Sequence, residues 1–167
     1  MKKILLVEGN LKEANQEFTE NGIKTHTESL QESISYYTNS LEIDSVNPSS
    51  DKDIFNKVKD LNKYEGLIWG GSSLNIYSDT KEIRRQIEFM KECQKKIKNI
   101  LAICWGMQVA VTAAGGVVNR GKNGAHRGIA HEIVINSDGL NHVSYTHLRA
   151  HETSYYLVCR LLRESGG

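Results

Sequence analysis

The protein has 167 residues, of which 39% are hydrophobic and 25% are charged, and its formal net charge is +1. This length and composition predict one compact globular domain. The charge balance excludes a strongly basic nucleic-acid surface, and no apolar run reaches the roughly 20 residues of a membrane-spanning helix. Three cysteines without metal-ligand spacing predict reduced thiols and no metal site. We therefore expect a cytoplasmic protein that binds neither nucleic acid nor membrane.

The predicted elements alternate between strand and helix along the chain. The first apolar run ends at Glu8, too early for a signal peptide, and therefore predicts a buried strand. Short aliphatic or alternating runs predict strands at residues 3–7, 41–46, 66–69, 99–103, 117–118 and 132–135. Apolar residues at helical spacing predict helices around residues 11–18, 27–37, 54–61, 83–90 and 105–114.

This alternation predicts an α/β fold with a mainly parallel, doubly wound sheet and helices on both faces. In such sheets the chemistry gathers at the carboxyl ends of the strands. Two unusual segments, residues 70–73 (Gly-Gly-Ser-Ser) and residues 104–108 (Cys-Trp-Gly-Met-Gln), each begin where a predicted strand ends. We therefore expect these two segments to meet and to form the functional site.

The last 25 positions differ in character from the rest. Residues 143–153 resemble a translated transposase-type sequencing adapter, and residues 157–162 resemble the flow-cell adapter that follows it. We therefore predict a partial domain at residues 1–142 and a non-native tail at residues 143–167 that packs poorly. The alternative is a real amphipathic helix, whose apolar stripe would contain Tyr156, Val158, Leu161 and Leu162.

Cys104 stands between a predicted strand and a predicted helix, which is typical of a nucleophile held on a tight turn. Ala102 and Gly106 supply the small neighbours that such a turn needs. The positive end of the following helix would favour the thiolate, and its backbone N–H groups could donate to a developing oxyanion. The spacing alone leaves a buried structural cysteine open as the alternative.

The motif Cys-Trp-Gly-Met-Gln at residues 104–108 resembles the cysteine motif of class I (triad-type) glutamine amidotransferases. The segment Gly-Leu-Ile-Trp-Gly-Gly-Ser at residues 66–72 is similar to the strand and glycine loop upstream of that cysteine. The resemblance covers residues 1–142 and is nearest to a stand-alone branch similar to the amidotransferase part of GMP synthase. It implies a flavodoxin-like fold and no metal or organic cofactor.

The resemblance implies a role for each matched residue. Cys104 would attack the carboxamide of glutamine, form a γ-glutamyl thioester and release ammonia. The backbone N–H groups of Gly71 and Trp105 would form the oxyanion hole, and Gln108 and Gly70 would help to bind the substrate. A solvated helix residue is the alternative for Gln108, and a plain turn is the alternative for the two glycines. The implied partner is an ammonia-accepting synthetase, which the sequence does not name.

The sequence departs from the family pattern in two places. Ala102 stands where the family usually has glycine, and no His-x-Glu pair, the base and its orienting residue, stands near the C-terminus. His151 and Glu152 are adjacent and lie in the predicted tail, while His126 and His131 fit surface or strand positions. We therefore expect a truncated domain without glutaminase turnover, because no base takes up the thiol proton.

Two other functions fit the same residues. The first is a cysteine hydrolase or peptidase that acts on γ-glutamyl or related amides, which glutamine-dependent labelling of Cys104 would distinguish from a glutaminase. The second is a non-enzymatic α/β module in which Cys104 is a regulatory thiol.

Overall fold

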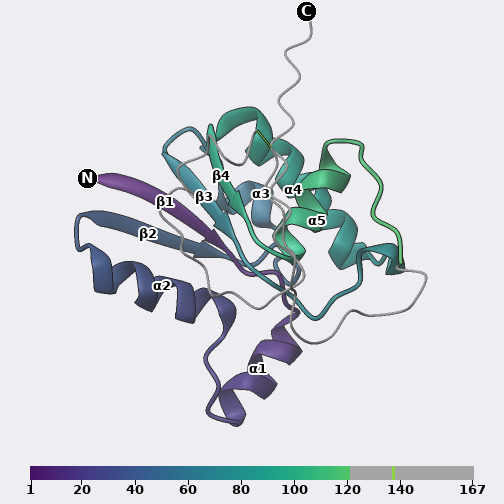
Figure 1. The fold of residues 1–167 in the computed structure, drawn as a ribbon, viewed down its shortest axis with the longest axis horizontal. Coiled ribbons are helices and arrows are strands. Elements are labelled where there is room, and N and C mark those ends of the chain that lie inside the picture. The colour runs from purple at the N-terminus through teal and green to yellow at the C-terminus, as the bar shows by residue number, and fades with distance from the viewer. Residues whose placement is uncertain (121–136, 138–167) are drawn as a thin grey trace, which may run out of the picture. The chain divides into compact units, whose positions relative to one another are not determined.

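The structure of the protein, a computed structural model, describes residues 1–120 and residue 137. All of its described strands and α-helices lie in one compact unit, Met1–Asn119 (Figure 1). The strand predicted at residues 132–135 and the tail predicted at residues 143–167 lie outside the described residues.

Four parallel strands form the described sheet, in the order β2-β1-β3-β4. Their bounds are Lys2–Val7 (β1), Leu41–Val46 (β2), Gly66–Trp69 (β3) and Asn99–Ala102 (β4). Val7 is paired with Val46 on one side and with Trp69 on the other, and Trp69 is paired with Ala102. The four strands therefore end level with one another, as the sequence predicts for a flavodoxin-like sheet.

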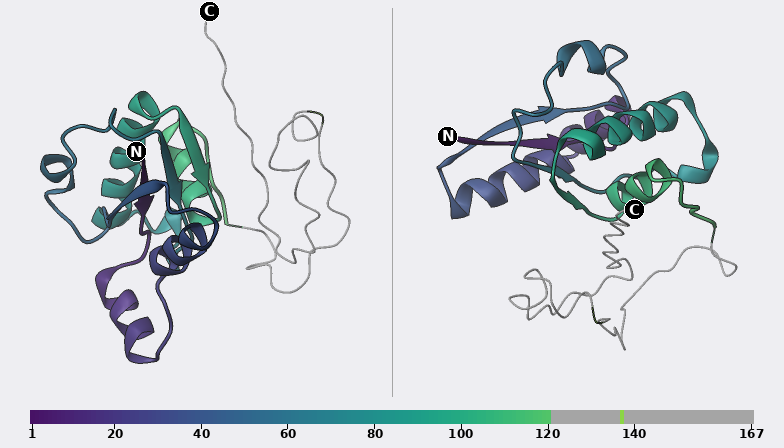
Figure 2. Two further views of the ribbon diagram at one scale, coloured as in Figure 1. Left: turned by 90° about the vertical axis from the view of Figure 1, so that its left-hand side faces the viewer. Right: turned by 90° about the horizontal axis from the view of Figure 1, so that it is seen from above.

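Helices follow the strands on both faces of this sheet. Their bounds are Lys12–Glu20 (α1), His26–Tyr37 (α2), Ile54–Lys57 (α3), Lys81–Lys96 (α4) and Trp105–Ala113 (α5). Figure 2 shows α2 and α4 on opposite sides of the sheet. No described helix combines the length and the apolar character that crossing a membrane requires.

Successive side chains of β1 point to opposite faces of the sheet, and both faces are covered. Leu5 and Val7 point into the main core, whereas Leu6 between them is equally buried but lies outside that cluster. The helix α2 packs against β1. The main core instead holds large side chains from β3, α4 and α5, chiefly Trp69, Phe89, Met90, Trp105 and Val109. The core therefore lies directly beneath the turn that carries Cys104.

The helix predicted around residues 54–61 is shorter than its apolar spacing suggests. Only the turn Ile54–Lys57 is helical, and Val58 leaves helical geometry at φ −105° and ψ 66°. The Asp60 side chain accepts a hydrogen bond from the Asn62 backbone N–H, a local turn that competes with a helix. Val58 and Leu61 still enter the core, so the burial expected from the pattern is present without the helix.

The strand predicted at residues 117–118 is also wrong. The helix α5 ends in a turn in which Gly115 has a φ of 88° and the Gly116 N–H donates to the Val111 carbonyl at 2.8 Å. Val118 then packs against the core without joining a strand. Hydrophobic packing accounts for the apolar residues that the sequence pattern assigned to a sheet.

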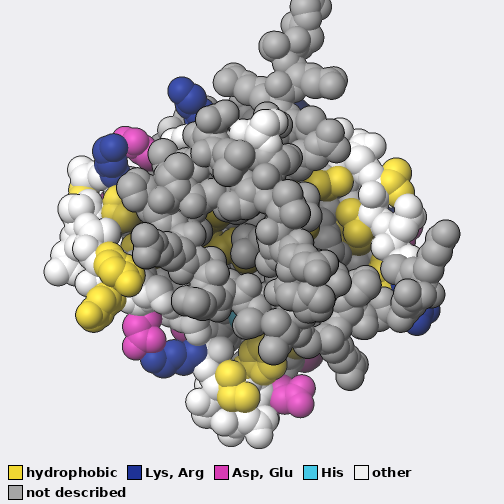
Figure 3. Space-filling model, in the orientation of Figure 1, with side chains coloured by type: hydrophobic (Ala, Val, Ile, Leu, Met, Phe, Trp, Pro, Cys, Tyr) yellow, Lys and Arg dark blue, Asp and Glu magenta, His cyan; other side chains and the backbone are white. Residues whose placement is uncertain are grey.

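Most charged residues of the described part lie on its surface, with Glu8 as a buried exception. In the face drawn in Figure 3, the visible acidic and basic side chains of these residues are interspersed. Exposed ion pairs such as Arg84–Asp79 and Lys95–Glu92 illustrate the pattern. Water and salt screen pairs of this kind, so each contributes little to the free energy of unfolding. The stability of this unit therefore rests on its core and its buried hydrogen bonds.

Candidate active site

Cys104 occupies the turn between β4 and α5, where the sequence predicts it. It is the N-cap residue of α5, and its backbone has a φ of 53° and a ψ of −104°. A positive φ is uncommon for a residue with a side chain and costs on the order of 1–3 kcal/mol. The surrounding structure must therefore hold the turn, which is the geometry of a nucleophile elbow. The thiol is partly exposed.

Gly106 makes the close approach that the turn requires. A Cβ atom on Gly106 would lie 2.4 Å from the carbonyl oxygen of Trp69. The Gly106 N–H donates to the Gly70 and Ile103 carbonyls, each at 3.0 Å. The absence of a side chain thus lets the first turn of α5 rest on the end of β3.

The glycine loop after β3 meets the cysteine turn, as the sequence predicts. The hydrogen bond from Gly106 to Gly70 joins the two segments directly. On its other side the loop faces α2, where Nδ1 of His26 lies 2.8 Å from the Gly71 carbonyl oxygen. The loop is therefore held from two directions.

Gln86 of α4 connects the cysteine turn to the loop after β1, a contact that sequence reasoning missed. Its Oε1 accepts a hydrogen bond from the Trp105 indole N–H at 2.8 Å, and its Nε2 donates to the Gly9 carbonyl at 3.2 Å. The Gln86 side chain is fully buried. A Cβ atom on Gly9 would lie 2.6 Å from the Trp105 ring, so Gly9 provides space for this indole.

A second buried group ties the end of β1 to α2. The Glu8 carboxylate accepts hydrogen bonds from the Asn10 N–H and from both the hydroxyl and the N–H of Thr27. The side-chain oxygen of Asn10 accepts from the Ser72 hydroxyl at 3.0 Å and from the Ser73 N–H at 2.9 Å. The Glu8 carboxylate and the Asn10 side-chain oxygen are thus buried and hydrogen-bonded at the carboxyl edge of the sheet, whereas the buried Asn10 Nδ2 has no hydrogen-bond partner among the described residues.

Gln108 lies one turn into α5 and is half-buried. Its N–H donates to the Cys104 carbonyl at 3.2 Å, and its carbonyl accepts from the Thr112 hydroxyl. These contacts belong to the helix backbone, so the substrate-binding role of the Gln108 side chain stays a prediction. The same holds for the roles assigned to Cys104, Trp105, Gly70 and Gly71.

A His-x-Glu triplet does occur in the described part, near the N-terminus, and sequence reasoning did not consider it. His26 faces the Gly71 carbonyl, whereas the Glu28 carboxylate accepts from the Thr25 N–H at 2.8 Å. The Thr25 hydroxyl accepts in turn from the Glu28 N–H, which completes a helix capping box. Glu28 therefore caps α2 instead of orienting His26.

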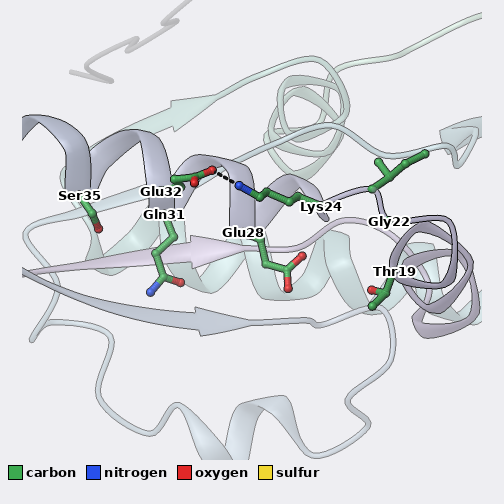
Figure 4. Close-up of a pocket in the computed structure, with 8 residues that line it drawn as sticks. Thr19, Gly22, Lys24, Glu28, Gln31, Glu32 and Ser35 are labelled. Atoms are coloured by element: carbon green, nitrogen blue, oxygen red, sulfur yellow. Dashed lines mark hydrogen bonds and ion pairs between the residues drawn. The ribbon is translucent and has the colours of Figure 1, made fainter.

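Other parts of the described surface are weaker candidates for a catalytic or binding site. The described residues include no group of three or more His, Cys, Asp or Glu placed to hold a metal ion. A shallow hollow of about 580 Å³ lies beside α2, and Figure 4 shows the ion pair of Lys24 with Glu32 at its side. None of its lining residues comes from the strand ends or from α5. The strand-end site is therefore the stronger candidate.

A family model described as glutamine amidotransferase class-I matches residues 20–157 of the chain. The chain belongs to this family. The four-stranded parallel sheet agrees with a class I amidotransferase fold. The matched range passes His142 and so includes residues 143–157 of the predicted tail, and the boundary at residue 142 stays a prediction.

Several curated proteins are similar to this class I amidotransferase chain over shorter stretches. Gamma-glutamyl peptidase 4 of Arabidopsis thaliana is 39% identical over 70 residues, which are 42% of this chain and 28% of that protein. A gamma-glutamyl-L-1-hydroxyisopropylamide hydrolase of a Pseudomonas species is 41% identical over 58 residues, or 35% of this chain and 20% of the hydrolase. Gamma-glutamyl peptidase 3 of Arabidopsis thaliana is 31% identical over 70 residues, with shares of 42% and 28%. The matched stretch spans less than a third of each of these relatives.

Proposed function

We propose that the protein cleaves γ-glutamyl amide bonds with Cys104 as the nucleophile. The backbone of the turn carries this proposal, because a strained, partly exposed cysteine stands between β4 and α5 at the edge where the glycine loop also ends. Strain of this kind persists where the surroundings enforce it, and it clusters at active sites. A structural cysteine would not need a positive φ.

The proposed reaction proceeds through a thioester. The Cys104 thiolate attacks the γ-carbonyl carbon, and the carbonyl oxygen takes up the negative charge. The N–H groups of Gly71 and Trp105 donate to this oxygen, because the first N–H groups of a helix have no acceptor within the helix and Trp105 is the first residue of α5. The C–N bond then breaks as the amine takes up a proton from a general acid, the role that the resemblance gives to the His-x-Glu pair absent from this sequence. Water then hydrolyses the thioester and restores the thiol.

Two substrates fit this chemistry. Glutamine, which would release ammonia, is the one that the family description favours. A γ-glutamyl peptide is the second, because relatives of this chain are named gamma-glutamyl peptidases and a gamma-glutamyl amide hydrolase. Both share the γ-glutamyl group and differ in the amine that leaves. An ammonia-accepting synthetase would be a partner only under the first alternative, and it stays a proposal together with the GMP-synthase-like branch.

The sequence has no His-x-Glu pair near its C-terminus, so the 167-residue chain by itself should show no turnover. The experiment therefore uses what we call the full-length protein, in which residues 1–142 continue into a C-terminal part that supplies this pair. It compares three substrates: glutamine, a γ-glutamyl dipeptide and an α-glutamyl dipeptide as control. We expect hydrolysis of at least one γ-glutamyl substrate and none of the α-linked dipeptide. Cys104→Ala should lower kcat by on the order of 10³-fold or more, because the nucleophile is lost. The matched control Cys93→Ala should keep kcat within about threefold of the wild type, because Cys93 is buried in the core away from the turn. Hydrolysis that survives Cys104→Ala would overturn the proposal.

A further inference from the structure

His26 is the first residue of α2, and its imidazole packs against the glycine loop. Nδ1 lies 2.8 Å from the Gly71 carbonyl oxygen. A Cβ atom on Gly71 would lie 3.1 Å from Cε1 and 3.3 Å from Nδ1 of the same ring. The imidazole thus occupies the space where a side chain at position 71 would stand, and it reaches the backbone because that position is glycine.

The direction of this hydrogen bond defines the tautomer of His26. A carbonyl oxygen accepts hydrogen bonds and has none to donate, so Nδ1 carries the proton. In the neutral ring Nε2 then has the lone pair, and the imidazolium would donate to Gly71 equally well. His26 therefore serves the loop as a hydrogen-bond donor in both charge states.

Two hydrogen bonds hold the two peptide groups on either side of the Gly71 Cα atom. The peptide before it is held by the Gly106 N–H, which donates to the Gly70 carbonyl at 3.0 Å. The peptide after it is held by His26 through the Gly71 carbonyl. Each peptide group is planar, so these contacts limit rotation about both backbone bonds of Gly71 and fix the direction of its N–H. Without them glycine is the residue with the most backbone freedom.

The start of α2 presents His26 rigidly. Before it, Thr25 forms the capping box with Glu28. After it, the hydroxyl of Thr27 donates at 2.8 Å to the buried Glu8 carboxylate at the end of β1. His26 is therefore anchored on both sides to groups that do not belong to the glycine loop. Because His26 is held in place independently of the glycine loop, its contact with Gly71 limits the movement of the loop.

We propose that His26 is a positioning residue that keeps the Gly71 N–H directed at the oxyanion as the γ-glutamyl thioester forms. This inference rests on the function proposed above. In that step the sulfur forms a bond to the γ-carbon, the carbonyl π electrons move onto the oxygen, and Gly71 donates a hydrogen bond to it. The oxyanion then re-forms the carbonyl as the amine leaves. His26 exchanges no proton at any point and acts only through Gly71.

The experiment uses the full-length protein with His26→Phe and His26→Asn, assayed on the γ-glutamyl substrate that the wild type hydrolyses. Phenylalanine keeps the ring against Gly71 but has no donor, whereas the asparagine amide can donate from nearly the place of Nδ1. We expect kcat to fall on the order of 10–100-fold in His26→Phe with KM within about twofold, because a misdirected oxyanion donor weakens the transition state. His26→Asn should recover most of kcat with an unchanged pH profile.

Alkylation of Cys104 by iodoacetamide provides the matched readout, because this reaction develops no oxyanion at the site. We expect its rate to be the same in both variants and in the wild type. A wild-type kcat in His26→Phe would overturn the inference. An Asn variant as inactive as the Phe variant, with equal alkylation rates, would also overturn it and point to proton transfer by His26. Activity that survives Cys104→Ala would instead refute the proposed function, so the two failures are distinguishable.

Discussion

Cys93 and Cys104 carry the same functional group in opposite settings. Cys93 lies on α4 with no exposed surface, and burial, followed by the neighbouring Glu92 charge, raises the pKa of its thiol to about 12. Cys104 is partly exposed on a turn with positive φ. The comparison teaches that the backbone around a cysteine, and not its presence in the sequence, separates a packing residue from a candidate nucleophile.

The alkylation rates of the two cysteines test this difference between their environments most directly. At pH 8 a thiol with a pKa of about 12 is ionised in only about one molecule in ten thousand, and burial also blocks the reagent. We therefore expect iodoacetamide to modify Cys104 at least on the order of 10³-fold faster than Cys93, measured by peptide mass mapping. Equal rates in the folded protein would contradict the assigned environments. Cys104→Ala is the control, and it should leave Cys93 as slow as before.

The next prediction tests the close contact beneath the Cys104 turn. Gly106→Ala would place a Cβ atom 2.4 Å from the Trp69 carbonyl oxygen, so β3 and α5 must separate. We expect a loss of about 3 kcal/mol in the free energy of unfolding, measured by urea denaturation. Gly66→Ala is the matched control, because its Cβ would meet ordinary contacts at 3.5 Å and beyond. That variant should change stability by no more than about 1 kcal/mol. Equal effects of the two substitutions would show that the turn does not depend on this contact.

Gln86 lies on the same helix as Cys93, but its side chain holds Trp105, the residue that follows Cys104. Gln86→Leu removes the partner of the buried Trp105 indole N–H. It also removes one of two donors to the Gly9 carbonyl, which keeps the hydrogen bond from the Ser72 hydroxyl. We expect a loss of about 2 kcal/mol in the free energy of unfolding. The double variant with Trp105→Phe should lose less than the sum of the two single variants, because the indole N–H is then absent. Strict additivity would mean that the hydrogen bond contributes nothing.

The last of these predictions is a pH dependence from Cys93. Its folded pKa of about 12 lies above that of an unfolded cysteine, so the unfolded chain loses the proton first as the pH rises. This contribution to stability is fully present below about pH 8.5 and declines by up to about 1.4 kcal/mol per pH unit above it. Urea denaturation between pH 8 and 10.5 should show this slope in the wild type and a shallower one in Cys93→Ala. Parallel slopes would place Cys93 outside the core.

The fold and the meeting of the two site segments could be predicted because they follow from local patterns. Strands alternating with helices imply a parallel sheet, and parallel strands bring their carboxyl ends to one edge. The segments after β3 and β4 therefore had to lie close together, as the hydrogen bond from Gly106 to Gly70 shows. The helix predicted around residues 54–61 is too long, because the spacing of apolar residues carries no information about the competing turn at Asp60.

The supporting residues could not be predicted, since their partners lie far along the chain. Gln86 stands on a charged helix and has the character of a surface residue, although it is fully buried against Trp105 and Gly9. His26 is a lone histidine at the start of a polar helix, and nothing in the neighbouring sequence indicates its contact with Gly71. The capping-box pattern of Thr25 and Glu28 was the one available signal, and it locates the start of α2 without indicating what His26 faces.

The most direct test of the central claim is to trap the covalent intermediate. The full-length protein is mixed with the γ-glutamyl substrate that it hydrolyses, quenched in acid within the first turnover, and digested for mass spectrometry. We predict one γ-glutamyl group attached to the peptide that contains Cys104, and none in the Cys104→Ala variant or on the Cys93 peptide. Full hydrolytic activity in Cys104→Ala, or a γ-glutamyl group attached to a different side chain, would contradict the assignment of Cys104 as the nucleophile.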